Sequence, residues 1–121
     1  MKKLILFVLF SLPLAASAGH MDVIEMELNE DCSMPKLMMI MKDFNKWGKS
    51  KGYQAEIAAP IQSNSLTSIF WIGRSKDTAA FGAAFDSWEG DLSNSGSAPA
   101  KLNARLEGCT TNVARRGYTL N

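Results

Sequence analysis

The sequence predicts one α+β domain in which helices cover one face of a four-stranded antiparallel sheet. Two observations support this prediction. After residue 18, segments with the two-residue period of strands alternate with segments of helical period, in the order β-α-β-β-α-β. The only two cysteines, Cys32 and Cys109, lie just after the first predicted strand and just before the last, where antiparallel pairing would bring them together.

The first 18 residues have the features of a secretory signal peptide. Two lysines precede an apolar run over residues 4–14, and Ala16-Ser17-Ala18 supplies a small-x-small cleavage site. The apolar run is shorter than the roughly 20 residues of a membrane-spanning helix. We therefore expect a periplasmic or secreted protein whose mature chain is a single domain over residues 19–121, with no membrane contact after cleavage.

Charge argues against nucleic-acid binding. The full chain has 13 basic and 12 acidic residues, and removal of the two leader lysines leaves 11 basic and 12 acidic. A chain without a positive surplus lacks the electrostatic attraction that nucleic acids require. The lysines concentrate between residues 36 and 51, which we interpret as the solvated face of a helix.

The cysteines predict one structural disulfide, Cys32–Cys109, because an exported chain with two cysteines normally pairs them. A chain with no CxxC motif and a single histidine lacks the ligands of a zinc site, so we expect no metal and no cofactor. We expect that histidine, His20, in a polar N-terminal tail outside the folded body.

The N-terminal half reads as strand, helix and strand. Residues 22–30 alternate, with Ile24, Met26 and Leu28 on one face and Glu25 and Glu27 on the other. A helix follows over residues 33–52, with Ser33 as its N-cap, Pro35 in its first turn and Gly52 as its stop. Its apolar stripe consists of Leu37, Ile40, Met41 and Phe44, with Met38 beside it. Residues 53–61 read as the second strand.

The C-terminal half begins with the most apolar strand, residues 66–73, which we expect to end at Gly73. A helix follows over residues 77–92, with Asp77 or Ser75 as its N-cap. A helix restarts near residue 98, and the last strand covers residues 110–120.

This order is the split βαβ arrangement of ferredoxin-like domains. Right-handed crossovers place the first and third strands in the centre of the sheet, and we expect those two to be parallel. The fourth strand would pair antiparallel with the first, and the second with the third.

A short exported ferredoxin-like domain with an extended second helical segment resembles the dimeric α/β-barrel superfamily, which includes antibiotic-biosynthesis-type and haem-degrading monooxygenases. The segments "FWIGRSKDTAAFGAAFDSW" and "NARLEGCTTNVARRGY" also resemble those of small exported bacterial proteins without assigned function. The resemblance implies two sheets paired in a homodimer, with a ligand held in the barrel or between sheet and helices. The absence of a histidine from the expected folded body argues against haem chemistry.

The third predicted strand supports a dimer on physical grounds. Ile69 and Trp71 share one face, and Phe70 and Ile72 the other, so both faces are apolar. Helices on one face alone would leave a tryptophan-bearing face open to water, and a second copy of the sheet would cover it.

The candidate ligand pocket lies on that uncovered face and is lined by Glu25, Glu27, Tyr53, Trp71 and Arg115. Arg115 and the next residue, Arg116, are consecutive in a strand and point to opposite faces. One of them should meet a glutamate of the first strand, either as a structural ion pair or as part of an anion-binding or acid/base pocket.

The function that follows is a non-enzymatic small-ligand-binding or structural homodimer. The alternative is a cofactor-independent, monooxygenase-like enzyme on the same scaffold, which would need a ligand-sized cavity with a polar residue in an unusual environment. A third possibility is an interaction module acting through a sheet edge. Since no catalytic motif is present, catalytic residues stay unassigned and the enzyme question stays open.

Overall fold

The computed structural model describes residues 19–121, and the predicted signal peptide lies outside the described residues. The predicted order of elements is confirmed, with the helical restart forming a separate third helix. The elements are β1 (Gly19–Leu28), α1 (Met34–Ser50), β2 (Gln54–Ala58), β3 (Ile69–Ser75), α2 (Thr78–Leu92), α3 (Ala98–Cys109) and β4 (Thr110–Leu120).

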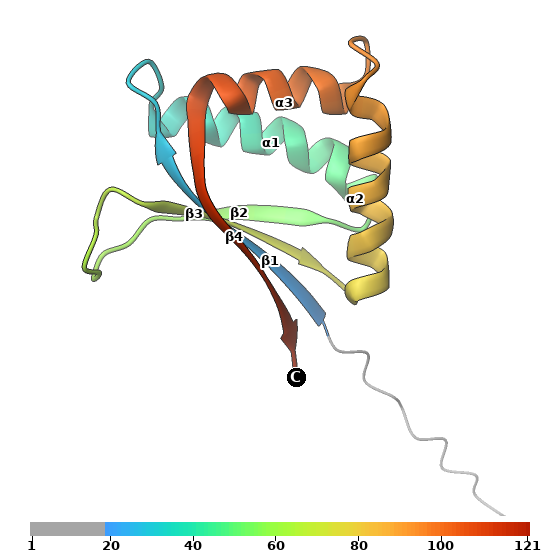
Figure 1. The fold of residues 1–121 in the computed structure, drawn as a ribbon, viewed down its shortest axis with the longest axis horizontal. Helices are drawn as coiled ribbons and strands as arrows, with labels where there is room; N and C mark the ends of the chain where they lie inside the picture. The colour runs from blue at the N-terminus through green and yellow to red at the C-terminus, as the bar shows by residue number, and fades with distance from the viewer. Residues whose placement is uncertain (1–18) are drawn as a thin grey trace, which may run out of the picture.

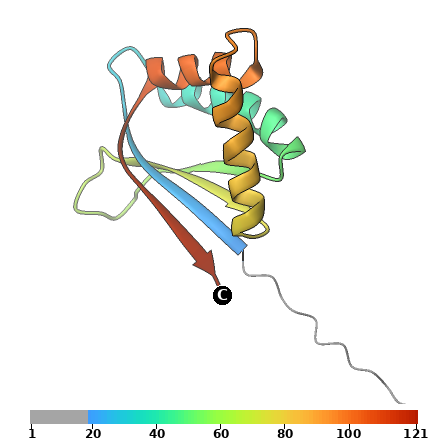
Figure 2. The same ribbon diagram turned by 45° about the vertical axis from the view of Figure 1, so that its right-hand side comes forward.

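The four strands form one antiparallel sheet in the order β2-β3-β1-β4. All three helices lie on the same side of it (Figures 1 and 2). This is the predicted ferredoxin-like α+β fold. The expected parallel pairing of β1 with β3 is wrong: the two are antiparallel, with Ile24 opposite Trp71. The helical crossover makes β1 and β2 run in the same direction, and the hairpin loop after β2 reverses the chain so that β3 fits between them.

The helices begin where the sequence predicts. The Ser33 hydroxyl accepts from the backbone N–H of Lys36, and Pro35 occupies the first turn of α1. The Asp77 carboxylate accepts from the backbone N–H of Ala80 at 2.7 Å, which selects Asp77 over Ser75 as the cap of α2.

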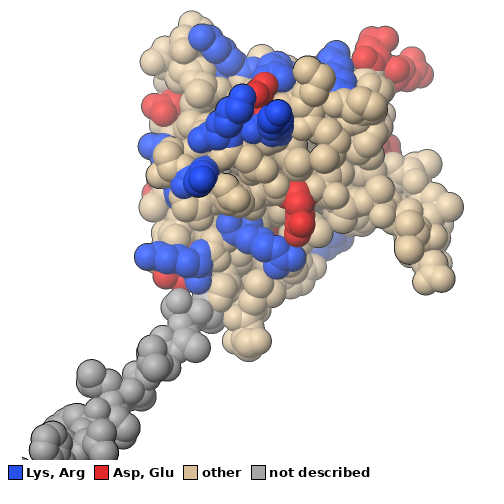
Figure 3. Space-filling view, turned by 180° about the vertical axis from the view of Figure 1, so that it is seen from behind, with Lys and Arg blue, Asp and Glu red and all other residues tan. Residues whose placement is uncertain are grey.

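The core lies between the sheet and the helices. Its buried apolar side chains come from α1, α2, α3 and the helix-facing side of the sheet, and include Leu37, Ile40, Phe44, Leu102, Met26 and Ile69. Met38 was expected beside the core stripe, but it is 40% exposed, because it lies on the outer side of α1. Figure 3 shows the molecule from behind, and Lys and Arg side chains gather over the upper part of this view. The lysines of α1 are mostly exposed, as predicted for a solvated face.

Strand alternation assigns each side chain of the central strands to a face. Met26 of β1 faces the helices, and Glu25 and Glu27 lie on the outer face, as predicted. Trp71 differs from the expectation. It lies opposite Ile24 on the helix-facing side and is only 4% exposed, so the helices cover it and the outer face carries Phe70 and Ile72 instead.

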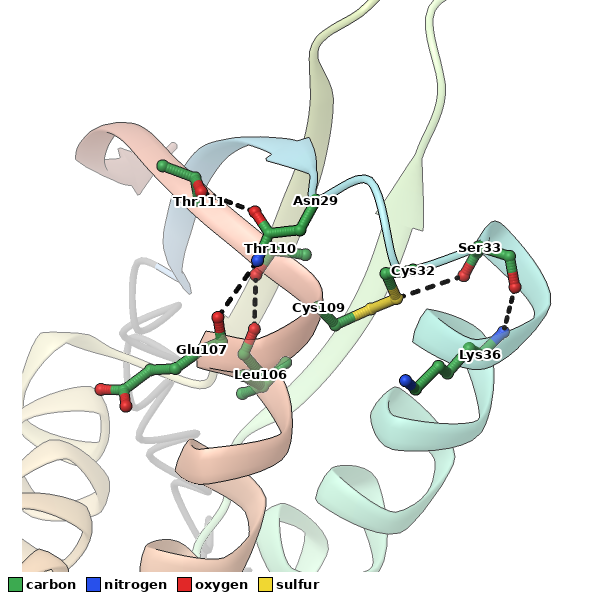
Figure 4. The surroundings of a disulfide bond; sticks show 9 residues. All are labelled: Asn29, Cys32, Ser33, Lys36, Leu106, Glu107, Cys109, Thr110 and Thr111. Carbon is green, nitrogen blue, oxygen red and sulfur yellow. Dashed lines mark hydrogen bonds between the residues drawn. A yellow bond between two sulfur atoms is a disulfide. The ribbon is translucent and has the colours of Figure 1, made fainter.

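The predicted disulfide joins Cys32 to Cys109 across 77 residues of sequence (Figure 4). It ties the loop after β1 to the last residue of α3. The adjacent Asn29 side chain donates to the Glu107 carbonyl and accepts from Thr111, so polar contacts support the same junction. On the chain-entropy account a loop of this length stabilises the fold by about 4 kcal/mol.

His20 lies within β1 rather than in a polar tail. Its ring is buried and stacks on Phe81 of α2, with centroids 4.2 Å apart. The folded body therefore does contain a histidine, which weakens the sequence argument against haem chemistry. Within residues 19–121 no helix has the length and apolar character to cross a bilayer.

Candidate functional site

A cavity of about 360 Å³ lies between the sheet and the helices. All three tryptophans of the chain line it, together with phenylalanines from α1 and α2. The aromatic lining consists of Phe44, Trp47, Tyr53, Trp71, Phe81, Phe85 and Trp88. Polar side chains of α3 and the first residues of β4 form another part of the wall: Asn103, Glu107, Thr110, Thr111 and Asn112. The volume and the apolar lining are those of a small-molecule site.

A buried polar network borders this cavity. Asp22 of β1 is 1% exposed, and its carboxylate receives two hydrogen bonds from Arg115 of β4, at 2.9 Å from Nε and 2.7 Å from Nη2. The Tyr53 hydroxyl donates to Asp22 Oδ2 at 3.0 Å and accepts from Trp71 Nε1 at 2.9 Å. The bidentate pairing supplies the countercharge that a buried carboxylate needs.

Tyr53 reaches Asp22 because Gly73 leaves room for its ring. Gly73 lies inside β3 opposite Asp22, rather than at the strand end that the sequence predicted. A Cβ atom at this position would collide with the Tyr53 ring and hydroxyl. The glycine therefore serves the close approach of a side chain to the strand, which is one of the recognised uses of glycine within strands.

A β-bulge in β4 decides which residues face the cavity. Met26 pairs with Asn112, whereas Glu25 pairs with Ala114, so Val113 is the extra residue. In a regular strand Asn112 and Arg115 would point to opposite faces, since they are three residues apart. The bulge brings both to the cavity side, in the manner of bulges that redirect side chains near binding sites.

The network keeps the phenol neutral and the guanidinium charged. Burial is the main cause that raises the pKa of Tyr53 above its ordinary value of 10.0, and the nearby charge of Asp22 adds to it. The hydrogen bonds to Asp22 raise the pKa of Arg115. Tyr53 is therefore a neutral hydrogen-bonding group in this site over the whole physiological pH range.

The guanidinium of Arg115 also contacts the aromatic wall. It lies 5.1 Å from the ring centroid of Phe85 and 6.0 Å from that of Phe81. At these separations the ring faces attract a cation. Arg115 thus joins the polar network to the aromatic lining of α2.

The five predicted pocket residues divide between the two faces of the sheet. Tyr53, Trp71 and Arg115 come together at the cavity. Glu25 and Glu27 lie on the outer face and do not line it, because they have the opposite parity to Asp22 in β1. The pocket therefore lies between sheet and helices, and not on the uncovered face where the sequence placed it.

The outer face holds the predicted ion pair of the two strands. Arg116 Nη1 lies 3.6 Å from Glu25 Oε2, with both side chains partly exposed. Arg74 of β3 pairs with Glu56 of β2 at 3.3 Å, where both side chains are more than half exposed.

Sequence reasoning missed Asp22, although a signal was present. Asp22 has the same parity as Ile24 and Met26, so the alternation already placed a carboxylate on the apolar face, where it must be paired. Trp47 and Trp88 were also missed as cavity residues. Their part in the cavity depends on how α1 and α2 approach each other, with ring centroids 5.2 Å apart, which no local pattern reveals.

The chain is similar in fold to several solved structures. SnoaB, a cofactor-independent oxygenase from Streptomyces nogalater, superposes with a TM-score of 0.57 at 10% sequence identity, over 87% of this chain and 95% of that one. A protein of unknown function from Bacteroides thetaiotaomicron, described as a possible oxidoreductase, gives 0.54 at 11% identity, over 88% and 100%. The hydroxynitrile lyase of Passiflora edulis gives 0.53 at 12% identity, over 88% and 95%.

These similarities show a shared fold, since the identities are too low to carry function across. No protein-family model matches the chain, and a search of curated proteins finds no match in sequence.

Proposed function

We propose that this protein is an exported homodimer that binds a small, largely apolar ligand in the cavity between its sheet and helices. The observation that carries the proposal is the aromatic cavity itself, about 360 Å³ in volume and lined by all three tryptophans. Four of its aromatic residues, Trp47, Phe81, Phe85 and Trp88, are only partly buried, so a ligand would remove further apolar surface from water.

The hydrogen bonds of the polar network support a protein that binds its ligand without reacting with it. Both carboxylate oxygens of Asp22 accept hydrogen bonds, and the Tyr53 hydroxyl both donates and accepts. To act as a general base, a side chain needs a proton-accepting atom within hydrogen-bond reach of the substrate. In this network the acceptors are already engaged, so its role is to hold Arg115 and Trp71 at the cavity wall.

Dimerisation is supported by the outer face of the sheet. Val23, Phe70 and Ile72 are half-buried there, and Tyr118 and Leu120 of the edge strand β4 are more exposed, although none of the helices within residues 19–121 covers this side. A second copy would shield these side chains from water. Sedimentation equilibrium tests this part of the proposal, and a monomer at high micromolar concentration would rule it out.

Export is supported by the disulfide, since such bonds persist in oxidising compartments. N-terminal sequencing of the protein recovered from the periplasm or medium tests it. A mature chain that still carries the predicted leader would contradict it.

A matched pair of tryptophan substitutions tests ligand binding. Leu106→Trp places a large ring in the cavity wall, whereas Leu66→Trp adds the same ring to an exposed position in the β2–β3 loop. The neutral fluorescent probe N-phenyl-1-naphthylamine should brighten with the wild type and with Leu66→Trp, and much less with Leu106→Trp. Equal brightening with both variants would show that the probe binds elsewhere, and the ligand-binding proposal would fail.

A second candidate function is a cofactor-independent, oxygenase-like enzyme. One observation favours it: a ligand-sized cavity borders a buried tyrosine whose pKa is raised by desolvation. SnoaB, which shares the fold, is an oxygenase of this kind. Oxygen consumption with autoxidisable phenols, compared between wild type and Tyr53→Phe, distinguishes the two candidates. Enzyme-dependent consumption that the substitution abolishes would favour the oxygenase.

A further inference from the structure

Two charged side chains, Glu107 and Arg115, line the cavity. Glu107 lines the cavity, and its exposed carboxylate accepts a hydrogen bond from Asn103 at 2.9 Å. Glu89 of α2 is near enough to Arg115 to contribute to the raised pKa of that residue. The buried Asp22 pairs with Arg115, so the carboxylate of Glu107 is the charge of the cavity lining that this pair does not balance. The field left over for a ligand therefore favours positive charge.

The aromatic wall offers several ring faces. The Phe44 ring lies at 86° to Trp71 and at 52° to Trp88, and Trp47 lies at 69° to Trp88. These rings meet at steep angles and are not stacked face to face, so their planes differ in orientation around the cavity. Indole faces attract cations more strongly than the other aromatic side chains.

Arg115 shows that this lining accepts a cation. Its guanidinium lies over Phe85 and within 6.0 Å of the Phe81 centroid. The tryptophan part of the wall, Trp47 and Trp88, has no Lys or Arg ring contact of this kind within residues 19–121. Moreover, α2 contributes Glu89 to this region and has no Lys or Arg between Thr78 and Leu92.

We infer that the cavity selects an organic cation, a ligand with a quaternary or alkylated ammonium group attached to an apolar body. This inference rests on the proposed function, because it names the ligand class of the same cavity. The ammonium group would lie against the tryptophan faces within the field of Glu107 and Glu89, and the apolar body would occupy the remaining aromatic lining.

The test compares two probes of nearly identical shape that differ in charge, phenyltrimethylammonium and tert-butylbenzene. Displacement of N-phenyl-1-naphthylamine gives the affinity of each. The inference predicts that the cation binds roughly tenfold more tightly than its neutral isostere. In the double variant Glu89→Gln/Glu107→Gln the cation should lose roughly fivefold in affinity, with the neutral probe unchanged. The control Glu30→Gln removes an exposed carboxylate that does not line the cavity and should change neither affinity.

The outcomes separate this inference from the proposed function. If tert-butylbenzene binds as tightly as the cation or more tightly, the cavity is a plain apolar site: ligand binding survives and the inference is overturned. If the cation binds more tightly but the double variant does not weaken it, the acidic groups are not its partners and the inference is likewise overturned. If the dye binds in the cavity but neither probe displaces it, the inference is overturned while ligand binding stands; if the dye does not bind there, both proposals fail.

Discussion

Arg115 and Arg116 are adjacent in sequence, and the two faces of the sheet give them different roles. Arg115 faces the helices and makes two short hydrogen bonds to a carboxylate that is almost fully buried. Arg116 faces outward and meets Glu25 at 3.6 Å, where its own side chain is 53% exposed. Both pairs join an arginine to a carboxylate, so the difference in their contributions comes from the burial of the carboxylate and from the geometry of the contact. An ion pair contributes most to stability where the loss of one partner leaves the other charge buried and unpaired.

The largest effect is expected from removal of the inner arginine. Arg115→Met leaves Asp22 buried without its countercharge and should lower the free energy of unfolding by about 3 kcal/mol. Arg116→Met is the matched control and should cost less than about 1 kcal/mol, since its pair is partly exposed. Urea unfolding followed by tryptophan fluorescence measures both. Equal losses would show that the two faces do not differ as described.

A smaller effect is expected at the tyrosine of the network. Tyr53→Phe removes the donor to Asp22 and leaves the buried Trp71 N–H without its acceptor, which should cost about 2 kcal/mol. Tyr118→Phe is the control on the outer face, where the side chain is 44% exposed, and a change within about 0.5 kcal/mol is expected. A loss in Tyr118→Phe as large as that in Tyr53→Phe would contradict this account of the network.

The most subtle difference between the faces is expected at alkaline pH. Because the pKa of Tyr53 is raised in the folded state, the folded chain holds a proton that the unfolded chain loses near pH 10.0. The resulting stability is fully present below pH 10.0 and declines as the pH rises above it. In Tyr118→Phe, which keeps Tyr53 as the only tyrosine, phenolate absorbance of the folded protein should appear well above pH 10.0. The same variant unfolded in guanidinium is the reference, and coincident titrations would disprove the shift.

Much of the fold could be predicted from the sequence because its determinants are local. The parity of Met26 and Glu25 and the caps at Ser33 and Asp77 each depend on spacing or on a few neighbouring residues, and the two cysteines could be paired because the sequence has no others. The relative direction of β1 and β3 was deduced wrongly, although it follows from the hairpin between β2 and β3.

The site was harder to predict because its determinants are not local. The bulge at Val113 has no signature of its own, since valine also suits a regular strand. Yet the bulge is what brings Asn112 and Arg115 to one face. Gly73 reads as a strand end until the ring of Tyr53, 20 residues earlier in the sequence, is seen to need the space. Local reasoning therefore found Tyr53, Trp71 and Arg115 but placed them on the wrong side of the sheet.

The position of the disulfide has a consequence for resistance to proteolysis. The β2–β3 loop, residues 59–68, projects from the sheet and carries Ile61 at 93% exposure, so it is the natural point of attack for a protease (Figure 1). A single cut there divides the chain between Cys32 and Cys109, so each fragment keeps one half of the bridge. The nicked protein would stay in one covalent piece, separating on a gel only after reduction. In a compartment rich in proteases, damage at its most exposed loop would leave the cavity and its walls joined.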